Sequence, residues 1–237
     1  MRLHRNLVYA VIDSLRDVFN DDVYADKAVE KALKRDKRWG ARDRKFVAET
    51  IYDIVRWKRL YGEIADVKTP YSRPDLWRLL VVWCVLRGIK LPDWNQIEET
   101  PTRRIKGRFD ELSQTRKYRE SIPDWIDELG VKELGEDIWT KEMAALNKRA
   151  DVILRTNTLN VTKEHLQKDL KQEGIETEFI NGCDDALRLV ERANVFKTEA
   201  FHKGFFEVQD ASSQLVAAYL DVEADICLAL PFRAALH

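Results

Sequence analysis

Apolar residues return at helical spacing through the first 150 residues of the chain. The first stripe runs from Leu3 to Phe19, with an apolar residue every three or four positions. Similar stripes predict helices over residues 22–35 and 43–64. Ser72 begins another helix, because a proline and an acidic residue follow it at the positions typical of a helix start. Further helices are expected over residues 103–118, 123–129 and 133–147.

The hydrophobic period changes after residue 150. Residues 152–157 predict a strand, and Thr162 begins an amphipathic helix that Gly174 ends. Strands are expected over 175–180, 186–190 and 204–208, followed by a helix over 211–220. The expected fold is therefore mostly α, with a small α+β domain. The predicted domain bounds are 1–148 for the helical domain, 149–220 for the α+β domain and 221–237 for a tail.

Composition limits the kind of protein. Of the 237 residues, 45% are hydrophobic and 34% charged, which favours a globular chain over a disordered or fibrous one. The apolar run over residues 79–86 is too short to cross a bilayer and predicts a buried helix. Asp13 interrupts the N-terminal apolar stretch early, which argues against a secretory signal. We therefore expect a cytoplasmic protein without a membrane partner.

Positive charge is concentrated early in the chain. Between Lys31 and Arg59, eleven Lys and Arg residues stand against four acidic ones. Such a cluster, with Trp39 inside it, suits nucleic acid, because cations neutralise phosphates and an indole stacks on a base. A solvated charged face remains an alternative. A second basic group favours a shared basic surface and consists of Arg103, Arg104, Lys106 and Arg108.

Motifs for metal or nucleophilic chemistry are missing from the sequence. The four histidines lack the spacing of metal ligands, and no Gly-rich phosphate loop or GxSxG turn occurs. No residue that would activate a thiol stands beside Cys84, Cys183 or Cys227. We therefore expect no metal site and no catalytic residue in this chain.

Four segments in order resemble the Sun/Fmu (Nop/Sun) family of RNA cytosine-5 methyltransferases. Residues 43–57 resemble the third helix of the NusB-like domain that precedes the enzyme in some members. Residues 121–130, SIPDWIDELG, resemble the family's proline-tryptophan segment. Residues 145–175 resemble its "R-x-N" strand and the helix after it, in a domain of RRM-like type. Residues 204–220, with the QDASSQ sequence, resemble the segment directly before the cofactor-binding strand.

The resemblance implies transfer of a methyl group from S-adenosylmethionine to C5 of a cytosine in ribosomal or transfer RNA. Family members use cysteines in Pro-Cys and Thr-Cys motifs, and none of the three cysteines here stands in one. No glycine follows Gly204, where the family has a Gly-rich cofactor loop. The chain is expected to bind no cofactor itself, to lack the Rossmann-like methyltransferase domain, and to end in a non-native or disordered tail of a truncated product.

Two functions stay open on this basis. The favoured one is the RNA-binding N-terminal part of the methyltransferase, catalytically incomplete by itself. The alternative is a non-enzymatic adaptor that resembles NusB and binds RNA or protein. The expected partner is structured ribosomal or transfer RNA. The predicted phosphate contacts are Arg35, Lys37, Arg38, Arg42, Arg44 and Lys45, with Trp39 for stacking and Arg56, Lys58 and Arg59 as a second group.

The α+β domain supplies the remaining candidates. By the resemblance, Arg155 and Asn157 match the R-x-N positions that contact RNA, although pinning the strand to its neighbours is an equally good interpretation. Near the end of the domain, Asp210 is suited to cap the last helix. The residues expected to hold the methyltransferase domain are Gln209, Asp210, Ser212 and Ser213.

Overall fold

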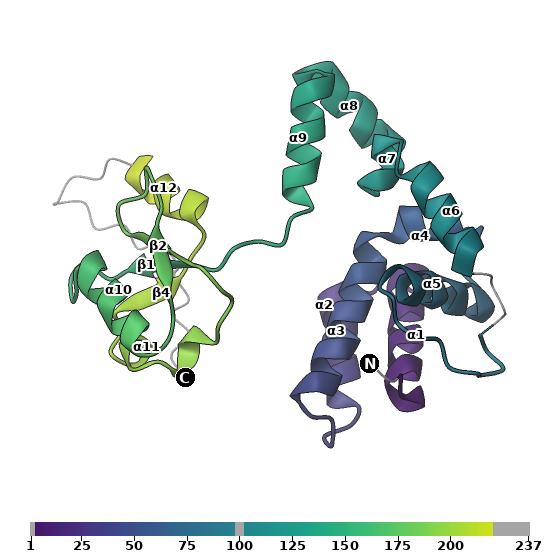
Figure 1. The fold of residues 1–237 in the computed structure, drawn as a ribbon, viewed down its shortest axis with the longest axis horizontal. Coiled ribbons are helices and arrows are strands. Elements are labelled where there is room, and N and C mark those ends of the chain that lie inside the picture. Colours follow the sequence, from purple (N-terminus) through teal and green to yellow (C-terminus); the bar gives the residue numbers. More distant parts are fainter. Residues whose placement is uncertain (1–2, 98–101, 220–237) are drawn as a thin grey trace. The chain divides into compact units, whose positions relative to one another are not determined.

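The structure is a computed structural model that describes residues 3–97 and 102–219. The chain divides into two compact units, Met1–Lys148 and Arg149–His237, a helical one and a mixed one (Figure 1). The predicted tail, Cys227 and the last residue of the predicted final helix lie outside the described residues. Within the described ranges, no helix is both long and apolar enough to cross a membrane.

The described part of the first unit is built from helices alone. They are α1 (Arg5–Asn20), α2 (Ala25–Lys34), α3 (Ala41–Arg56), α4 (Lys58–Ala65), α5 (Arg73–Leu86), α6 (Thr102–Leu112), α7 (Arg116–Arg119), α8 (Asp124–Leu134) and α9 (Glu136–Leu146). Helix α5 is apolar on nearly all sides, and α1, α3, α4 and α6 pack around it. The expected buried helix over residues 79–86 is therefore confirmed.

The start of α5 follows the predicted chemistry. The Ser72 hydroxyl accepts a hydrogen bond from the backbone N–H of Asp75 at 3.4 Å, and the Asp75 carboxylate accepts one from the backbone N–H of Ser72 at 2.9 Å. Pro74 occupies the first turn, where its missing N–H costs nothing. Gly88, with φ +66°, follows the end of the helix.

Two predicted helices are each broken into a pair. The stretch 43–64 forms α3 and α4, because Trp57 leaves helical geometry at φ −96° and ψ 20°. This break changes the direction of the chain, so that α4 packs against α5 and α6. The stretch 103–118 forms α6 and α7, with Thr115 in an extended conformation between them. Periodicity alone did not show either break, because the apolar stripe continues on both sides.

The second unit holds one antiparallel sheet. Its elements are β1 (Ile153–Thr156), α10 (Lys163–Gln172), β2 (Thr177–Phe179), β3 (Ala186–Leu189), the 3-10 helix η1 (Val195–Lys197), α11 (Glu199–His202), β4 (Phe206–Val208) and α12 (Ala211–Tyr219). The strand order is β2-β3-β1-β4, which is the order of a ferredoxin-like fold. The expected combination of a mostly helical part and a small α+β domain is confirmed. The sequence did not predict η1 and α11, which are too short to show a period.

The two faces of the sheet differ. Leu154 of β1 pairs with Leu187 of β3, and both are fully buried beneath the helices. The opposite face carries Arg155, which stands between Ala186 and Glu207 in the register. Further along that face, Arg188 pairs with Glu178 at 2.6 Å. The face turned away from α10 therefore carries charged side chains, of which Arg188 and Glu178 pair with each other.

Candidate nucleic-acid interface

The basic segment 35–45 is part loop and part helix. Residues 35–40 connect α2 to α3, whereas Arg42, Arg44 and Lys45 belong to the first turns of α3. Helix α3 begins after Gly40, whose backbone N–H donates to the carboxylate of Asp43 at 3.3 Å. The basic turn is therefore shorter than the sequence indicated. Some of its cations belong to the loop and the others to helix α3.

Trp39 does not fit the stacking role expected for it. Its side chain lies in the main hydrophobic core and the residue is only 6% exposed. Base stacking needs an open ring face, which this indole does not offer. The expectation is corrected: Trp39 anchors the basic segment to the core, and its aromatic character misled the sequence interpretation.

Two of the expected phosphate contacts hold acidic partners. Arg35 pairs with Asp13 of α1 at 2.8 Å. Arg38 donates to both carboxylate oxygens of Asp36, at 2.9 and 2.7 Å. These bonds lower the pKa of Asp36 to about 2. Both arginines are exposed and remain reachable by solvent, but each already has an acidic partner.

Arg44 has a structural role at the base of the segment. Its Nε donates to the carbonyl of Trp39 at 3.1 Å, and its Nη1 donates to the carbonyl of Leu33 at 3.2 Å. The two carbonyls belong to the end of α2 and to the loop. Arg44 therefore fixes the path of the chain between α2 and α3.

Two cations of the basic segment, Lys37 and Arg42, are uncommitted, which means that no described residue pairs with their side chains. Both side chains are exposed and form no ion pair or hydrogen bond with any described residue. Lys45 has only a long contact of 3.9 Å with Glu49 on the next turn of α3. These three cations keep their charge available to an anionic partner. Of the seven residues in the basic segment that the sequence suggested as RNA contacts, Lys37, Arg42 and Lys45 therefore keep a charge that is free to meet an anion.

The second expected group serves packing. Arg59 donates to the carbonyl of Ile122 and pairs with Asp124 at 2.7 Å, with 22% of its side chain exposed. Lys58 lies over the ring of Phe19, 5.0 Å from its centroid. In the same way, Arg56 donates to a backbone carbonyl, that of Asn147, at 3.2 Å. Arg56 and Arg59 thus connect α3 and α4 to segments that follow α7, and Lys58 contacts α1, so the three residues do not form an open basic face.

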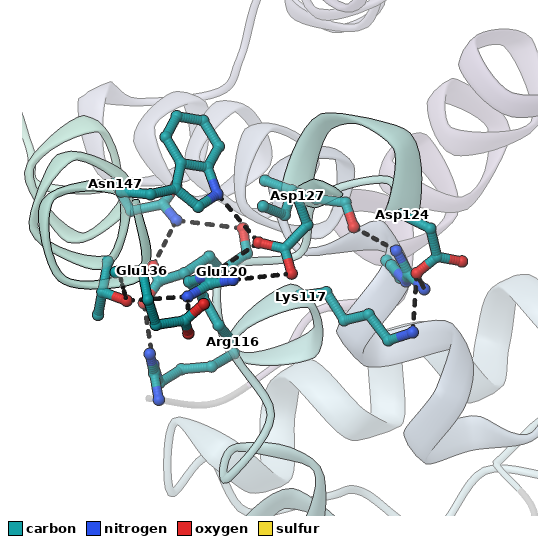
Figure 2. A network of polar contacts seen from close by, with 12 residues as sticks. Arg116, Lys117, Glu120, Asp124, Asp127, Glu136 and Asn147 are labelled. Atoms are coloured by element: carbon teal, nitrogen blue, oxygen red, sulfur yellow. Dashed lines mark hydrogen bonds and ion pairs between the residues drawn. The ribbon is translucent and has the colours of Figure 1, made fainter. Parts of the chain in front are cut away.

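A polar network holds α7, α8 and α9 together, and Figure 2 shows it from close by. Arg116 of α7 is the centre, with only 10% of its side chain exposed. Its Nε donates to Asp127 of α8 at 2.7 Å, and its Nη1 reaches Glu136 and, at 3.0 Å, Thr140 of α9. These carboxylates raise the pKa of Arg116, and the guanidinium lowers the pKa of Asp127. The sequence did not single out Arg116, since its partners are 11 to 24 residues away.

Close helix packing completes this network. A Cβ atom at Gly130 of α8 would lie 2.2 Å from the indole of Trp139 on α9. The Trp139 Nε1–H donates to Asp127 at 3.0 Å, so the indole cannot move without losing that bond. In addition, the Asn147 amide donates to the Glu120 carboxylate at 2.8 Å. These contacts are those of a scaffold, because the charged side chains of the network pair with one another.

In the second unit, Asn157 pins the end of β1. Its Nδ2 donates to the carbonyl of Gly204 at 2.9 Å, and its backbone N–H donates to the carbonyl of Phe205 at 2.8 Å. Arg155 is exposed and reaches Gln209 at 3.4 Å. Of the two interpretations that the sequence left open, pinning describes the contacts of Asn157, whereas Arg155 stays open to a partner.

The predicted docking residues lie at the start of α12. The Asp210 carboxylate accepts a hydrogen bond from the backbone N–H of Ser212 at 3.1 Å, as an N-cap residue does. The backbone carbonyl of Gln209 accepts a bond from the Gln214 side chain at 3.0 Å. Ser213 is exposed and makes no side-chain bond with a described residue. Their expected contact with another domain stays a prediction.

The described residues do not fit S-adenosylmethionine or a catalytic thiol. Cys84 is buried, and desolvation raises its pKa to about 12. Cys183 is also buried, and burial raises its pKa. The described sheet is antiparallel, without a parallel strand that ends in a Gly-rich loop. Within the described ranges, no three His, Cys, Asp or Glu side chains gather as metal ligands.

Comparisons with known proteins bear on both units. The family model of the ferredoxin-like domain of RsmF/B-like methyltransferases matches residues 122–196. The probable ribosomal RNA small subunit methyltransferase B of Synechocystis sp. is 25% identical over 252 aligned positions, which cover 91% of this chain and 56% of that protein. The ribosomal RNA small subunit methyltransferase B of Vibrio cholerae is 34% identical over 102 positions, or 23% of its length.

A solved structure supports the same fold. The crystal structure of PH0851 has a TM-score of 0.58 and 18% sequence identity, and the match covers 94% of this chain and 57% of that one. The chain thus spans about half the length of the longest matches. Together with the ferredoxin-like topology of the second unit, these matches show that the chain is a homologue of the RsmB/Sun family of ribosomal RNA methyltransferases and corresponds to their N-terminal part.

Proposed function

We propose that the chain is the RNA-recognising N-terminal part of a ribosomal RNA cytosine-5 methyltransferase that takes its methyl group from S-adenosylmethionine. The observation that carries this proposal is the family match through the ferredoxin-like domain, joined to a helical unit with uncommitted surface cations. The described residues lack a fitting cofactor site, so no step of methyl transfer is assigned to them. Their part is to bind and orient RNA.

The basic segment at the start of α3 supports phosphate binding. Lys37 and Arg42 are exposed and without a described partner, so an RNA phosphate would not have to displace an existing ion pair. Each phosphate that such a side chain neutralises releases counterions from the RNA, which favours binding at low salt. Lys45 adds a third cation one turn along α3, whereas Arg35 and Arg38 contribute less because acidic neighbours already hold them.

We expect the double variant Lys37→Gln/Arg42→Gln to bind a small-subunit ribosomal RNA fragment more weakly than the wild type. Fluorescence anisotropy at several salt concentrations would measure it. Affinity at low salt should fall on the order of tenfold, and the slope of log Kd against log salt should decrease by about two, since two phosphate contacts are lost.

The control is Lys132→Gln/Lys141→Gln on α8 and α9, which removes the same charge from two exposed positions outside the basic segment. It should change the salt slope by much less. Equal effects of the two double variants would mean that net charge, and not this surface, governs binding. Absence of RNA binding by the wild type would contradict the proposed function itself.

A further inference from the structure

Helix α6 carries a glycine that packing does not explain. Gly107 lies in the middle of an eleven-residue helix, where glycine destabilises by about 0.5–1 kcal/mol relative to alanine. A Cβ at this position would meet nothing within 4 Å, so no neighbour requires its absence. This contrasts with Gly130, where an indole fills the space. The bare backbone at Gly107 therefore faces open solvent.

The positive charges around Gly107 also lack partners among the described residues. Arg103, Arg104 and Lys106 are exposed and form no ion pair or hydrogen bond with a described residue. No acidic residue stands in the first turn of α6. Cations at this end of a helix oppose its dipole, which costs a few tenths of a kcal/mol each. Arg108 differs from them, because it donates to the carbonyl of Glu63.

Helix geometry brings these features to one face. Ile105 is the fully buried residue of α6 and defines its inner side. At about 100° per residue, Gly107 lies between Arg103 and Arg104 on the outer side. An extended anionic polymer fits this surface, since its backbone can approach the helix closely at the glycine while cations on both sides reach its phosphates.

This surface is separate from the basic segment before α3. Helix α6 packs on α4 and α5, whereas α2 and α3 pack on α1 and on each other. Figure 1 shows α6 and the α2–α3 loop at different ends of the helical unit. The shared basic surface that the sequence suggested is therefore two surfaces.

We propose that the outer face of α6 around Gly107 is a second contact for the phosphate backbone of RNA. The inference rests on the proposed RNA-binding function and adds a site to it. RNA that reaches both surfaces has to extend from one end of the helical unit to the other. Long structured RNA should therefore bind more tightly than a short hairpin that covers one surface.

Gly107→Gln is the sharpest test, because it should not harm the fold. The position is open, and glutamine favours helix more than glycine does, so the melting temperature should stay equal or rise. The added side chain would nevertheless block close approach, and affinity for a long small-subunit ribosomal RNA fragment should fall severalfold. Arg103→Gln/Arg104→Gln should lower it on the order of tenfold and reduce the salt slope by about two.

The matched control is Glu111→Gln on the outer side of the same helix, which should leave affinity unchanged or raise it slightly. If the α6 variants bind like the wild type while Lys37→Gln/Arg42→Gln binds weakly, the second contact is refuted and the proposed function stands. If the wild type does not bind RNA at all, both fail together. Reduced binding by Glu111→Gln equal to that of Gly107→Gln would also overturn the α6 contact.

Discussion

Arg116 connects three helices through one guanidinium. Its partners are Asp127 on α8 and the pair Glu136 and Thr140 on α9, and the side chain is largely enclosed (Figure 2). An enclosed cation with good hydrogen-bond geometry contributes little net energy while it is paired, but its removal leaves carboxylates without a donor. The residue is therefore a structural requirement of this region rather than an RNA contact.

We expect Arg116→Gln to lower the free energy of unfolding by about 2 kcal/mol at neutral pH, because Asp127 loses its main donor. The lowered pKa of Asp127 makes this effect depend on pH. Stability from a carboxyl with a depressed folded-state pKa is fully present above the ordinary value of 3.8 and is lost as the pH falls through the folded-state value.

Urea unfolding of the wild type and of Arg116→Gln at pH 7 and near pH 3 would measure this pH dependence. The difference between wild type and variant should shrink as the pH falls below 3.8, because Asp127 then takes up a proton in the unfolded chain while the ion pair of the folded wild type resists its protonation. A difference that is constant with pH would show that packing of the Arg116 side chain, and not its ion pair, holds the helices. Lys132→Gln, at an exposed position on α8, is the control and should change stability by less than about 0.5 kcal/mol.

At the scale of elements, two of the glycines inside helices, Gly130 and Gly107, differ in what surrounds them. Gly130 allows α8 to approach the Trp139 ring on α9, whereas Gly107 faces open space on α6. The same substitution, glycine to alanine, should therefore change the melting temperature in opposite directions at the two positions. Helix propensity favours alanine at both by up to about 1 kcal/mol, so that the difference comes from packing.

Gly130→Ala should lower the melting temperature, since the indole must shift and its bond to Asp127 is lost, at a cost of about 1–3 kcal/mol. Gly107→Ala should raise the melting temperature slightly. Thermal unfolding followed by circular dichroism would decide both. A stabilised Gly130→Ala protein would mean that α8 and α9 do not pack closely.

Local signals in the sequence predicted the starts of several elements. Ser72 and Thr162 cap their helices as expected, because a cap depends on residues only two or three positions away. The break at Trp57 was missed, since it is set by how α4 packs on α5 and α6. The same limit explains the short α11, which is fixed by contacts with α10 and β4.

The candidate site shows the same limit. Sequence could locate the cations of the basic segment, but not which of them already have partners. Arg35 pairs with Asp13, 22 residues earlier, and Trp39 is buried by helices distant in the sequence. Lys37 and Arg42 remain because neither forms an ion pair with a described acidic residue, although Asp36 and Asp43 are their neighbours in the sequence. Ion pairs between residues that are distant in the sequence thus decide which cations remain available to RNA, and the spacing of residues along the chain does not show these pairs.

At the scale of the whole molecule, the chain joins a helical unit to a ferredoxin-like domain of a methyltransferase family. The sheet face of that domain is charged and paired through Arg188 and Glu178, so it does not resemble an open aromatic platform for bases. The proposed binding by phosphate contact fits this distribution of side chains.

Photo-cross-linking of the chain to small-subunit ribosomal RNA, followed by mass spectrometry of the linked peptides, tests RNA recognition most directly. We expect cross-links in peptides that contain Lys37 and Arg42, with a second set in α6, and their loss at high salt. Cross-links confined to α8 and α9, or none above the level of an unrelated protein of equal charge, would contradict it.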